Sequence, residues 1–210
     1  MTDQQVYPQL QMRATGLSCG RGGLVLCNNI DFSLTNGQAI LLRGPNGTGK
    51  TTLLLTLAGI VAPLAGQFGP QSDGDEAPLT HYCGHRNAIK PRLTVLENLA
   101  FWAAINGQTG LSPQTALAEV GLGDLDALDA GYLSAGQSRR LALARLLVSL
   151  RPLWLLDEPT AALDDQGHQL VARLLADHLA MGGLAIAATH DPITLPDPAR
   201  LSTLILERAS

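Results

Sequence analysis

The sequence predicts an α/β fold with a mostly parallel sheet, flanked by helices, and a small inserted helical lobe. Four short apolar runs alternate with helical patterns along the 210 residues. These runs are continuously hydrophobic, as expected for strands that are covered on both faces. They are AILLR at 39–43, LTHYC at 79–83, LWLLD at 153–157 and LAIAAT at 184–189.

The helical lobe is predicted from capping signals between about residues 94 and 150. Thr94 and Glu97 have the spacing of a capping box. Ser112 is a candidate N-cap, with Pro113 at the first helical position and Gly121 as a stop signal. We therefore expect a second group of helices that is separate from the α/β core.

The composition favours one domain over residues 1–210. Hydrophobic residues make up 46% of the chain, enough for a full core. We place the core at about 1–90 and 151–210, and the lobe at about 91–150. The segment 69–78 is rich in Gly, Pro and acidic residues, which predicts a surface loop.

Charge and hydropathy limit the partners and the location. The net charge of −4 argues against nucleic acid as a main partner. The apolar runs are far shorter than the roughly 18 to 20 residues that cross a bilayer, and the polar start lacks the pattern of a secretory leader. We therefore expect a cytosolic chain. Its three cysteines have no C-x-x-C spacing, so we expect reduced thiols.

The segment GPNGTGKTT follows AILLR directly and fits the P-loop pattern G-x-x-x-x-G-K-[ST]. Its glycines let backbone N–H groups surround phosphate oxygens, and the helix that follows adds its positive N-terminal end. Lys50 supplies a compact charge, and Thr51 is left to hold Mg²⁺. A Gly-rich turn before an ordinary helix is the alternative. The predicted nucleotide-binding residues are Gly44, Pro45, Asn46, Gly47, Thr48, Gly49, Lys50, Thr51 and Thr52.

Two further strands end in polar residues. LWLLDEP brings Asp157 and Glu158 to the C-terminal edge of the sheet, where ligands bind in such folds. Asp157 suits Mg²⁺ coordination, and Glu158 can polarise a water for attack on a γ-phosphate. His190 follows LAIAAT and could contact the same phosphate. The alternatives are an acidic turn before Pro159 and an ordinary surface histidine.

The segment YLSAGQSRRLALARLLVSL predicts a second helix whose N-terminus could bind an anion. Ser134 is near its start, small residues allow close approach of the backbone, and an amphipathic run carries Arg139, Arg140 and Arg145. One nucleotide does not need two such helix ends. We therefore expect this one to serve the nucleotide of another chain, with a plain capped helix as the alternative.

Together, GPNGTGKTT, LSAGQ, LWLLDEPTAALD and ATH, in this order, resemble the nucleotide-binding domain of ABC ATPases over nearly the whole chain. The resemblance implies a P-loop NTPase core that binds ATP and Mg²⁺ and acts as an ATPase. It also implies a homodimer in which each ATP lies between one P-loop and the partner's signature. The implied roles are Glu158 and His190 in catalysis, Thr51 and Asp157 on the metal, Asp164 in the D-loop, and Leu133, Ser134, Ala135, Gly136 and Gln137 as the signature.

A narrower resemblance is to the haem-exporter ATPases of cytochrome c maturation. It is carried by LSCGRGG, by GH followed by IK, by LTVLENLAFW and by LSAGQSRRLALARL. It implies a peripheral subunit at the cytoplasmic face of the bacterial inner membrane, docked on CcmB-like and CcmC-like membrane subunits and acting on a CcmE-like periplasmic haem chaperone. The alternatives are another small ABC exporter, a soluble ABC ATPase and a small-molecule P-loop kinase. The kinase does not explain LSAGQ.

The segment HYCGHRNAIKP is rich in possible metal ligands. Strand alternation would place His81, Cys83 and His85 on one face, which leaves a metal or haem site open. We favour a strand that leads into a transmission loop. There, the resemblance implies a glutamine that touches Mg²⁺. Arg86 occupies that position, and its side chain has no oxygen atom that could bind the metal.

Two more positions depart from the family pattern. Ala135 replaces a glycine of the common signature, which costs little if its φ is negative. Arg21 replaces the aromatic residue expected to stack on adenine, and its planar guanidinium can also stack on a ring.

Overall fold

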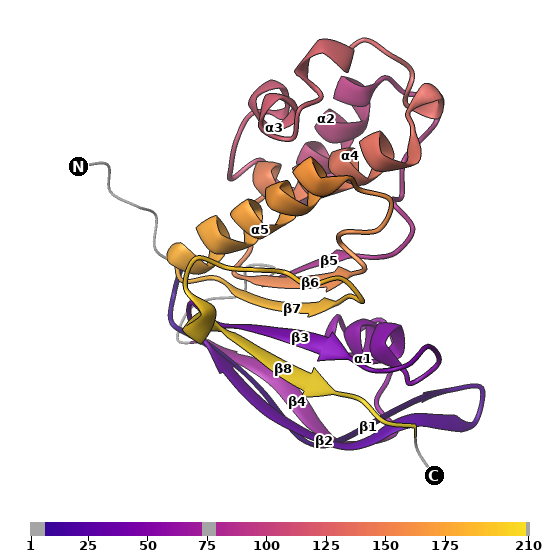
Figure 1. Ribbon diagram of the computed structural model, residues 1–210, viewed down its shortest axis with the longest axis vertical. Coiled ribbons are helices and arrows are strands. Elements are labelled where there is room, and N and C mark those ends of the chain that lie inside the picture. Colours follow the sequence, from indigo (N-terminus) through magenta and orange to yellow (C-terminus); the bar gives the residue numbers. More distant parts are fainter. Residues whose placement is uncertain (1–6, 73–78, 209–210) are drawn as a thin grey trace. The chain divides into compact units, whose positions relative to one another are not determined.

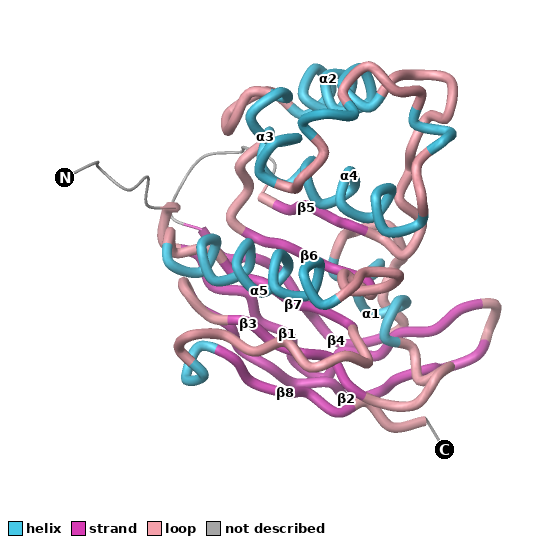
Figure 2. Tube along the Cα trace, turned by 45° about the horizontal axis from the view of Figure 1, so that its top comes forward, coloured by secondary structure: helices cyan, strands magenta, loops and turns pink. Residues whose placement is uncertain are grey.

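The computed structural model describes residues 7–72 and 79–208, and it divides the chain into two compact units. The sheet unit comprises Met1–Gly84, Pro152–Glu158 and Ala172–Ser210. The helical unit comprises His85–Arg151 and Pro159–Val171. Figures 1 and 2 show the sheets in the first unit and most of the helices in the second.

The sheet unit contains a five-stranded parallel sheet in the order β5-β6-β7-β3-β8. Every residue of the two strands β6 and β7 is buried, as their continuous apolar runs predict. The four strands expected from the sequence are confirmed, whereas β8 was not predicted. Their bounds are β3 Ala39–Arg43, β5 Thr80–Cys83, β6 Leu153–Asp157, β7 Leu184–Ala188 and β8 Leu201–Ile205.

A second, antiparallel sheet has the order β2-β1-β4 and was also not predicted. Its strands are β1 (Leu10–Arg21), β2 (Leu24–Thr35) and β4 (Ala65–Ser72). Gly22 and Gly23 join β1 to β2 with φ angles of 60° and 82°. Positive φ at both central residues is the requirement of a type I′ hairpin turn, so glycine is needed here for its backbone conformation.

The surface loop expected at 69–78 is wrong for residues 69–72, which pair with β1 as the end of β4. Because β4 is an edge strand, the missing N–H of Pro70 is tolerated there. Residues 73–78 lie outside the described part of the chain.

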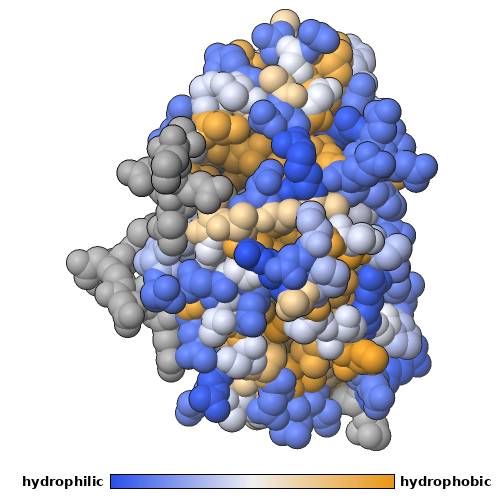
Figure 3. Space-filling model, turned by 60° about the vertical axis from the view of Figure 1, so that its left-hand side comes forward, coloured by the Kyte–Doolittle hydropathy of each residue, from blue (hydrophilic) through white to orange (hydrophobic). Residues whose placement is uncertain are grey.

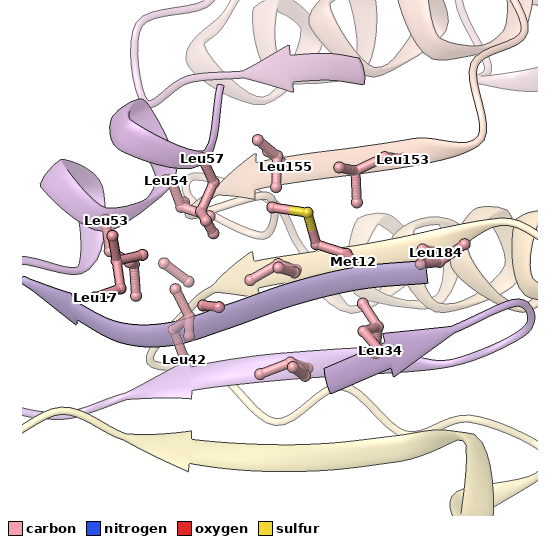
Figure 4. Packing of buried hydrophobic residues seen from close by; sticks show 14 of the residues in the cluster. Met12, Leu17, Leu34, Leu42, Leu53, Leu54, Leu57, Leu153, Leu155 and Leu184 are labelled. Carbon is pink, nitrogen blue, oxygen red and sulfur yellow. The ribbon is translucent and has the colours of Figure 1, made fainter. Parts of the chain in front are cut away.

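The core of the sheet unit lies between the two sheets and helix α1 (Lys50–Leu57) (Figure 4). Met12 and Leu17 on β1 are fully buried, and so are Leu34 on β2 and Leu42 on β3. They pack with Leu53, Leu54 and Leu57 of α1, Leu153 and Leu155 of β6, and Leu184 of β7. This packing holds α1, and with it the P-loop, against β1, β6 and β7.

Three ring side chains near the N-terminal ends of β6 and β7 form a second buried cluster. His178 is completely buried, and its ring stacks on Trp154 with centroids 3.8 Å apart. Tyr7 meets the same ring edge-on at 5.3 Å. The Nε2 atom of His178 lies 3.1 Å from the carbonyl oxygen of Leu184. Burial lowers the pKa of His178 to about 3.

The helical unit contains α2 (Val95–Asn106), α3 (Pro113–Glu119), α4 (Ala135–Val148) and the first turns of α5 (Asp165–Ala180). The predicted capping box of Thr94 and Glu97 is confirmed, and so is the Ser112 N-cap with Pro113 at the first position. Gly121 follows the end of α3 with a positive φ of 73°. Short 3₁₀ turns are found at Gly123–Leu125 and Ala130–Tyr132 in this unit, and at Pro198–Arg200 in the sheet unit.

The face shown in Figure 3 carries mostly hydrophilic residues with apolar groups between them. In the described part of the chain, no helix has both the length and the hydropathy of a membrane span.

Candidate nucleotide-binding site

The P-loop joins β3 to α1, as the sequence predicts, and its glycines are favoured by a close contact at Gly44 and by positive φ angles. A Cβ on Gly44 would lie 2.3 Å from the carbonyl oxygen of Leu206. Gly49 caps α1 in the left-handed region, with φ of 91°. The Thr48 hydroxyl donates to the carbonyl oxygen of Pro45 at 2.9 Å, which closes the loop on itself. The N-terminus of α1 therefore opens into a loop of the kind that binds phosphate.

Lys50 lies at the first position of α1 and is largely buried. Its ammonium donates to the carbonyl oxygens of Gly44 at 2.7 Å and Pro45 at 3.0 Å. The charge is therefore held inside the loop before any phosphate enters. An ammonium has three donors, so it can bind a phosphate oxygen and still contact the loop.

Thr51 and Asp157 bring two oxygen atoms together at the edge of the sheet. The Thr51 hydroxyl donates to Asp157 Oδ1 at 3.1 Å, and Asp157 is buried at the end of β6. A hydroxyl beside a carboxylate is the hard oxygen donor set that Mg²⁺ prefers, usually together with water and phosphate oxygens. These two residues fit a magnesium ion.

Glu158 follows β6 with an unusual backbone conformation. Its φ is 50°, in the left-handed region, and its N–H donates to the carbonyl oxygen of Ala188 at 2.7 Å. The Asp157 carboxylate contacts Thr51, whereas the Glu158 carboxylate contacts His190. Non-glycine residues in this region cost about 1–3 kcal/mol and are frequent at functional sites.

His190 lies beside Glu158 and the P-loop. Its backbone N–H donates to Glu158 Oε2 at 3.3 Å, and its Nε2 lies 3.6 Å from Glu158 Oε1. The same Nε2 is 3.0 Å from Asn46 Oδ1. The ends of β3, β6 and β7 thus bring together three groups that the sequence assigned to one nucleotide.

In the helical unit, α4 begins at a second candidate anion site. Ser134 is its N-cap, and it forms a capping box with Gln137 through hydrogen bonds of 3.2 Å and 2.9 Å. Ala135 is the first helical residue and is not among the residues with positive φ, so its methyl group introduces no backbone strain. A Cβ on Gly136 would lie 2.9 Å from the carbonyl oxygen of Ala162.

A hollow of about 500 Å³ opens at this end of α4, within the helical unit. Ser134, Gln137, Arg140 and Asp164 supply polar groups to its lining. Arg140 and Asp164 form an ion pair at 3.1 Å. Asp164 also accepts a hydrogen bond from the Gly167 amide at 2.8 Å, and this bond, together with Arg140, lowers the pKa of Asp164 below its usual range.

The sequence comparisons identify the family. A family model described as ABC transporter matches residues 27–161, which is more than half of the chain. The chain belongs to the ABC transporter family. The matched segment includes both the P-loop and the N-terminal end of α4.

Curated ABC transporter relatives match most of the chain. Two of them are named cytochrome c biogenesis ATP-binding export protein CcmA. The one from Rhodopseudomonas palustris (strain HaA2) is 49% identical and covers 88% of this chain and 94% of the relative. The one from Rhizobium meliloti (strain 1021) is 48% identical and covers 88% and 93%.

Solved ABC transporter structures share the fold. An ATP-binding protein from Pyrococcus furiosus superposes with a TM-score of 0.78 at 24% identity, over 93% of this chain and 97% of that one. MJ1267, an ATP-binding cassette in its ADP conformation, gives 0.70 at 20% identity, over 87% and 82%. These confirm the predicted P-loop α/β fold.

The candidate metal ligands His81, Cys83 and His85 do not lie on one face of a strand. β5 ends at Cys83, so His85 does not continue its alternation: His81 and Cys83 are buried, whereas His85 is exposed in the following loop. Among the described residues, no three His, Cys, Asp or Glu side chains are grouped to hold a metal. The alternative of a three-ligand site is therefore not supported. All three cysteines are free and buried.

Arg86 and Arg21 are both exposed, Arg86 in the loop after β5 and Arg21 at the last position of β1. Two other arginines have structural contacts that were not predicted: Arg139 was named only as part of the amphipathic run, and Arg43 was not singled out. Arg139 is buried and donates to the carbonyl oxygen of Pro159 at 3.2 Å. Arg43 donates to two carbonyl oxygens beside His190. Arg43 belongs to no motif, although its place directly before Gly44 was a signal that it lies at the site.

Proposed function

We propose that this chain is the ATP-hydrolysing subunit of an ABC-type haem exporter in cytochrome c maturation. The ATPase activity is supported chiefly by one observation: the P-loop, Asp157 with Glu158, and His190 converge at one edge of the parallel sheet. The exporter assignment rests on relatives that are nearly half identical over almost their whole length and carry the name CcmA.

The P-loop and Lys50 bind the β- and γ-phosphates of ATP in this proposal. Thr51 and Asp157 hold Mg²⁺, which neutralises charge on the phosphate oxygens when it is bound. The nucleotide-binding set is Gly44 to Thr52, as predicted from the motif. The carbonyl oxygens of Gly44 and Pro45 keep the ammonium of Lys50 inside the loop, so little reorganisation is needed when the phosphates bind.

Glu158 orients the attacking water and accepts its proton, and His190 donates a hydrogen bond to the γ-phosphate. The 3.6 Å separation of Glu158 Oε1 from His190 Nε2 supports a shared task for the two groups. A water beside these groups would be within reach of the carboxylate, as general base catalysis requires.

The α4 end serves the nucleotide of a second copy of the chain. Leu133, Ser134, Ala135, Gly136 and Gln137 form the signature, and Asp164 belongs to the D-loop. A capped helix N-terminus and a neighbouring arginine favour a phosphate in the hollow. The active form is therefore a homodimer with two shared ATP molecules.

Arg86 passes the nucleotide state to the membrane subunits, which we propose to be CcmB-like and CcmC-like. Its exposed position in the loop after β5 suits a contact with a partner. The homodimer acts peripherally at the cytoplasmic face of the bacterial inner membrane, and a CcmE-like haem chaperone receives the output. Nucleic acid has no part in this function.

Gene deletion with complementation tests the assignment. Deletion should abolish c-type cytochromes, detected by haem staining, and the wild-type gene should restore them. Lys50→Ala should not restore them, whereas Arg13→Met, at an exposed position of β1, should. Normal c-type cytochromes after deletion would indicate another ABC exporter. A chain found wholly in the soluble fraction of cells would favour a soluble ABC ATPase.

A further inference from the structure

Arg43 connects the strand before the P-loop to the loop that carries His190. It is the last residue of β3 and directly precedes Gly44. Its Nη1 donates to the carbonyl oxygen of Thr189 and its Nη2 to that of Asp191, both at 2.7 Å. Thr189 and Asp191 flank His190, so one planar guanidinium holds the backbone on both sides of the histidine.

The backbone of Arg43 is held in place by hydrogen bonds to neighbouring segments. The carbonyl oxygen of Arg43 accepts a hydrogen bond from the Leu206 amide at 2.8 Å, and its backbone pairs with β8. Hydrogen bonds from a charged donor are short and strong, and the guanidinium fork fixes two acceptors in one plane. A lysine ammonium is a point charge and cannot reproduce this geometry. The chemistry therefore requires arginine if both carbonyl oxygens are to be held.

The position of this loop determines two contacts of the proposed catalytic groups. The His190 amide donates to Glu158 Oε2 at 3.3 Å, and the His190 ring lies 3.0 Å from Asn46. The His190 side chain is about half exposed, so the position of its ring depends largely on the backbone at residue 190. A shift of the backbone at residue 190 would therefore move both the ring and the hydrogen-bond donor to the Glu158 carboxylate.

We propose that Arg43 is a positioning residue for ATP hydrolysis, which clamps the Thr189–Asp191 backbone and so keeps His190 and Glu158 aligned on the γ-phosphate. The proposal rests on the proposed ATPase function. Arg43 acts through His190 rather than by touching ATP, so its loss should lower the rate of the chemical step more than the affinity for nucleotide. Displacements of about 1 Å at such sites cost on the order of 10²-fold in rate.

The test compares steady-state ATPase rates of the full chain with Arg43→Met, Arg43→Lys and the control Arg13→Met. We expect Arg43→Met to lower kcat about 10- to 100-fold, with KM for ATP changed less than about threefold. Arg43→Lys should retain more activity than Arg43→Met but less than the wild type. An unchanged kcat in either variant, or a change in KM alone, would overturn the proposal.

A double-mutant cycle with His190→Ala separates positioning from a general effect on folding. If Arg43 acts through His190, Arg43→Met should have little further effect on kcat when His190 is already alanine. Multiplied losses would contradict the proposal. Thermal unfolding identifies variants that do not fold, and in that case Arg43→Lys carries the test. If neither the wild type nor Arg13→Met hydrolyses ATP, the proposed function fails as well; if both do, only the role of Arg43 is in question.

Discussion

The buried histidine of the sheet unit predicts a specific loss of stability in acid. Burial lowers the pKa of His178 to about 3, from an ordinary value of 6.5, and repulsion from His81 acts in the same direction. The contact of Nε2 with the carbonyl oxygen of Leu184 opposes the shift and is outweighed. Folding therefore favours the neutral ring, which is sandwiched against Trp154 and cannot be hydrated.

The direction and the size of this change in the free energy of unfolding follow from proton binding at His178. Between pH 6.5 and pH 3 the unfolded chain binds a proton at His178 and the folded chain does not, so the free energy of unfolding falls as the pH is lowered. The loss approaches about 1.4 kcal/mol for each pH unit in this window. At pH 5.5 this single residue should cost about 1.4 kcal/mol, and at pH 5 about 2 kcal/mol, relative to pH 7.5.

Denaturant unfolding at pH 7.5, 6.5, 5.5 and 5 measures this loss. His178→Phe keeps a ring against Trp154 but removes the titration, so its stability should depend less steeply on pH than that of the wild type. Its absolute stability will also fall because the Leu184 carbonyl oxygen loses a partner. His85→Gln, at an exposed position, should keep the wild-type slope. Equal slopes for His178→Phe and the wild type would refute the argument.

Three further predictions concern the site and the same cluster. Glu158→Gln should retain ATP binding by calorimetry but lower turnover by about 10²- to 10⁴-fold, because the base is lost; wild-type turnover would exclude that role. Lys50→Ala should weaken ATP binding itself, and unchanged affinity would count against the phosphate contact. Gly183→Ala places a Cβ 2.3 Å from the ring of His178 and should destabilise the fold by about 1–3 kcal/mol, measured by denaturant unfolding.

The sequence predicts the parallel strands because their pattern has one physical origin. A strand that is buried on both faces must be apolar throughout, and β6 and β7 are. β1 was missed because its pairing with β2 shifts between Ala14 and Leu17 and again near Cys19, which breaks a regular alternation. β8 was missed because LSTLI at the sheet edge is partly exposed and mixes polar with apolar residues.

Some features of the candidate site are determined by local sequence, and others by contacts between residues that are distant in the sequence. The P-loop, Asp157 and Glu158 are signalled by short motifs, so they could be located from the sequence. The clamp on the His190 loop could not, because Arg43 and Thr189 are 146 residues apart. The left-handed backbone of Glu158 was also unforeseen, since it depends on a hydrogen bond to Ala188 in a neighbouring strand.

The positive φ of Glu158 lowers folding stability at a residue whose carboxylate is needed for ATP hydrolysis. Glycine would adopt this backbone without the cost of about 1–3 kcal/mol that a side chain incurs in the left-handed region, but it has no carboxylate. Directed evolution for heat resistance alone would thus drive position 158 away from glutamate and yield sturdier chains that bind ATP without turning it over. Any thermostabilised version of this ATPase should therefore be screened for turnover as well as for its melting temperature.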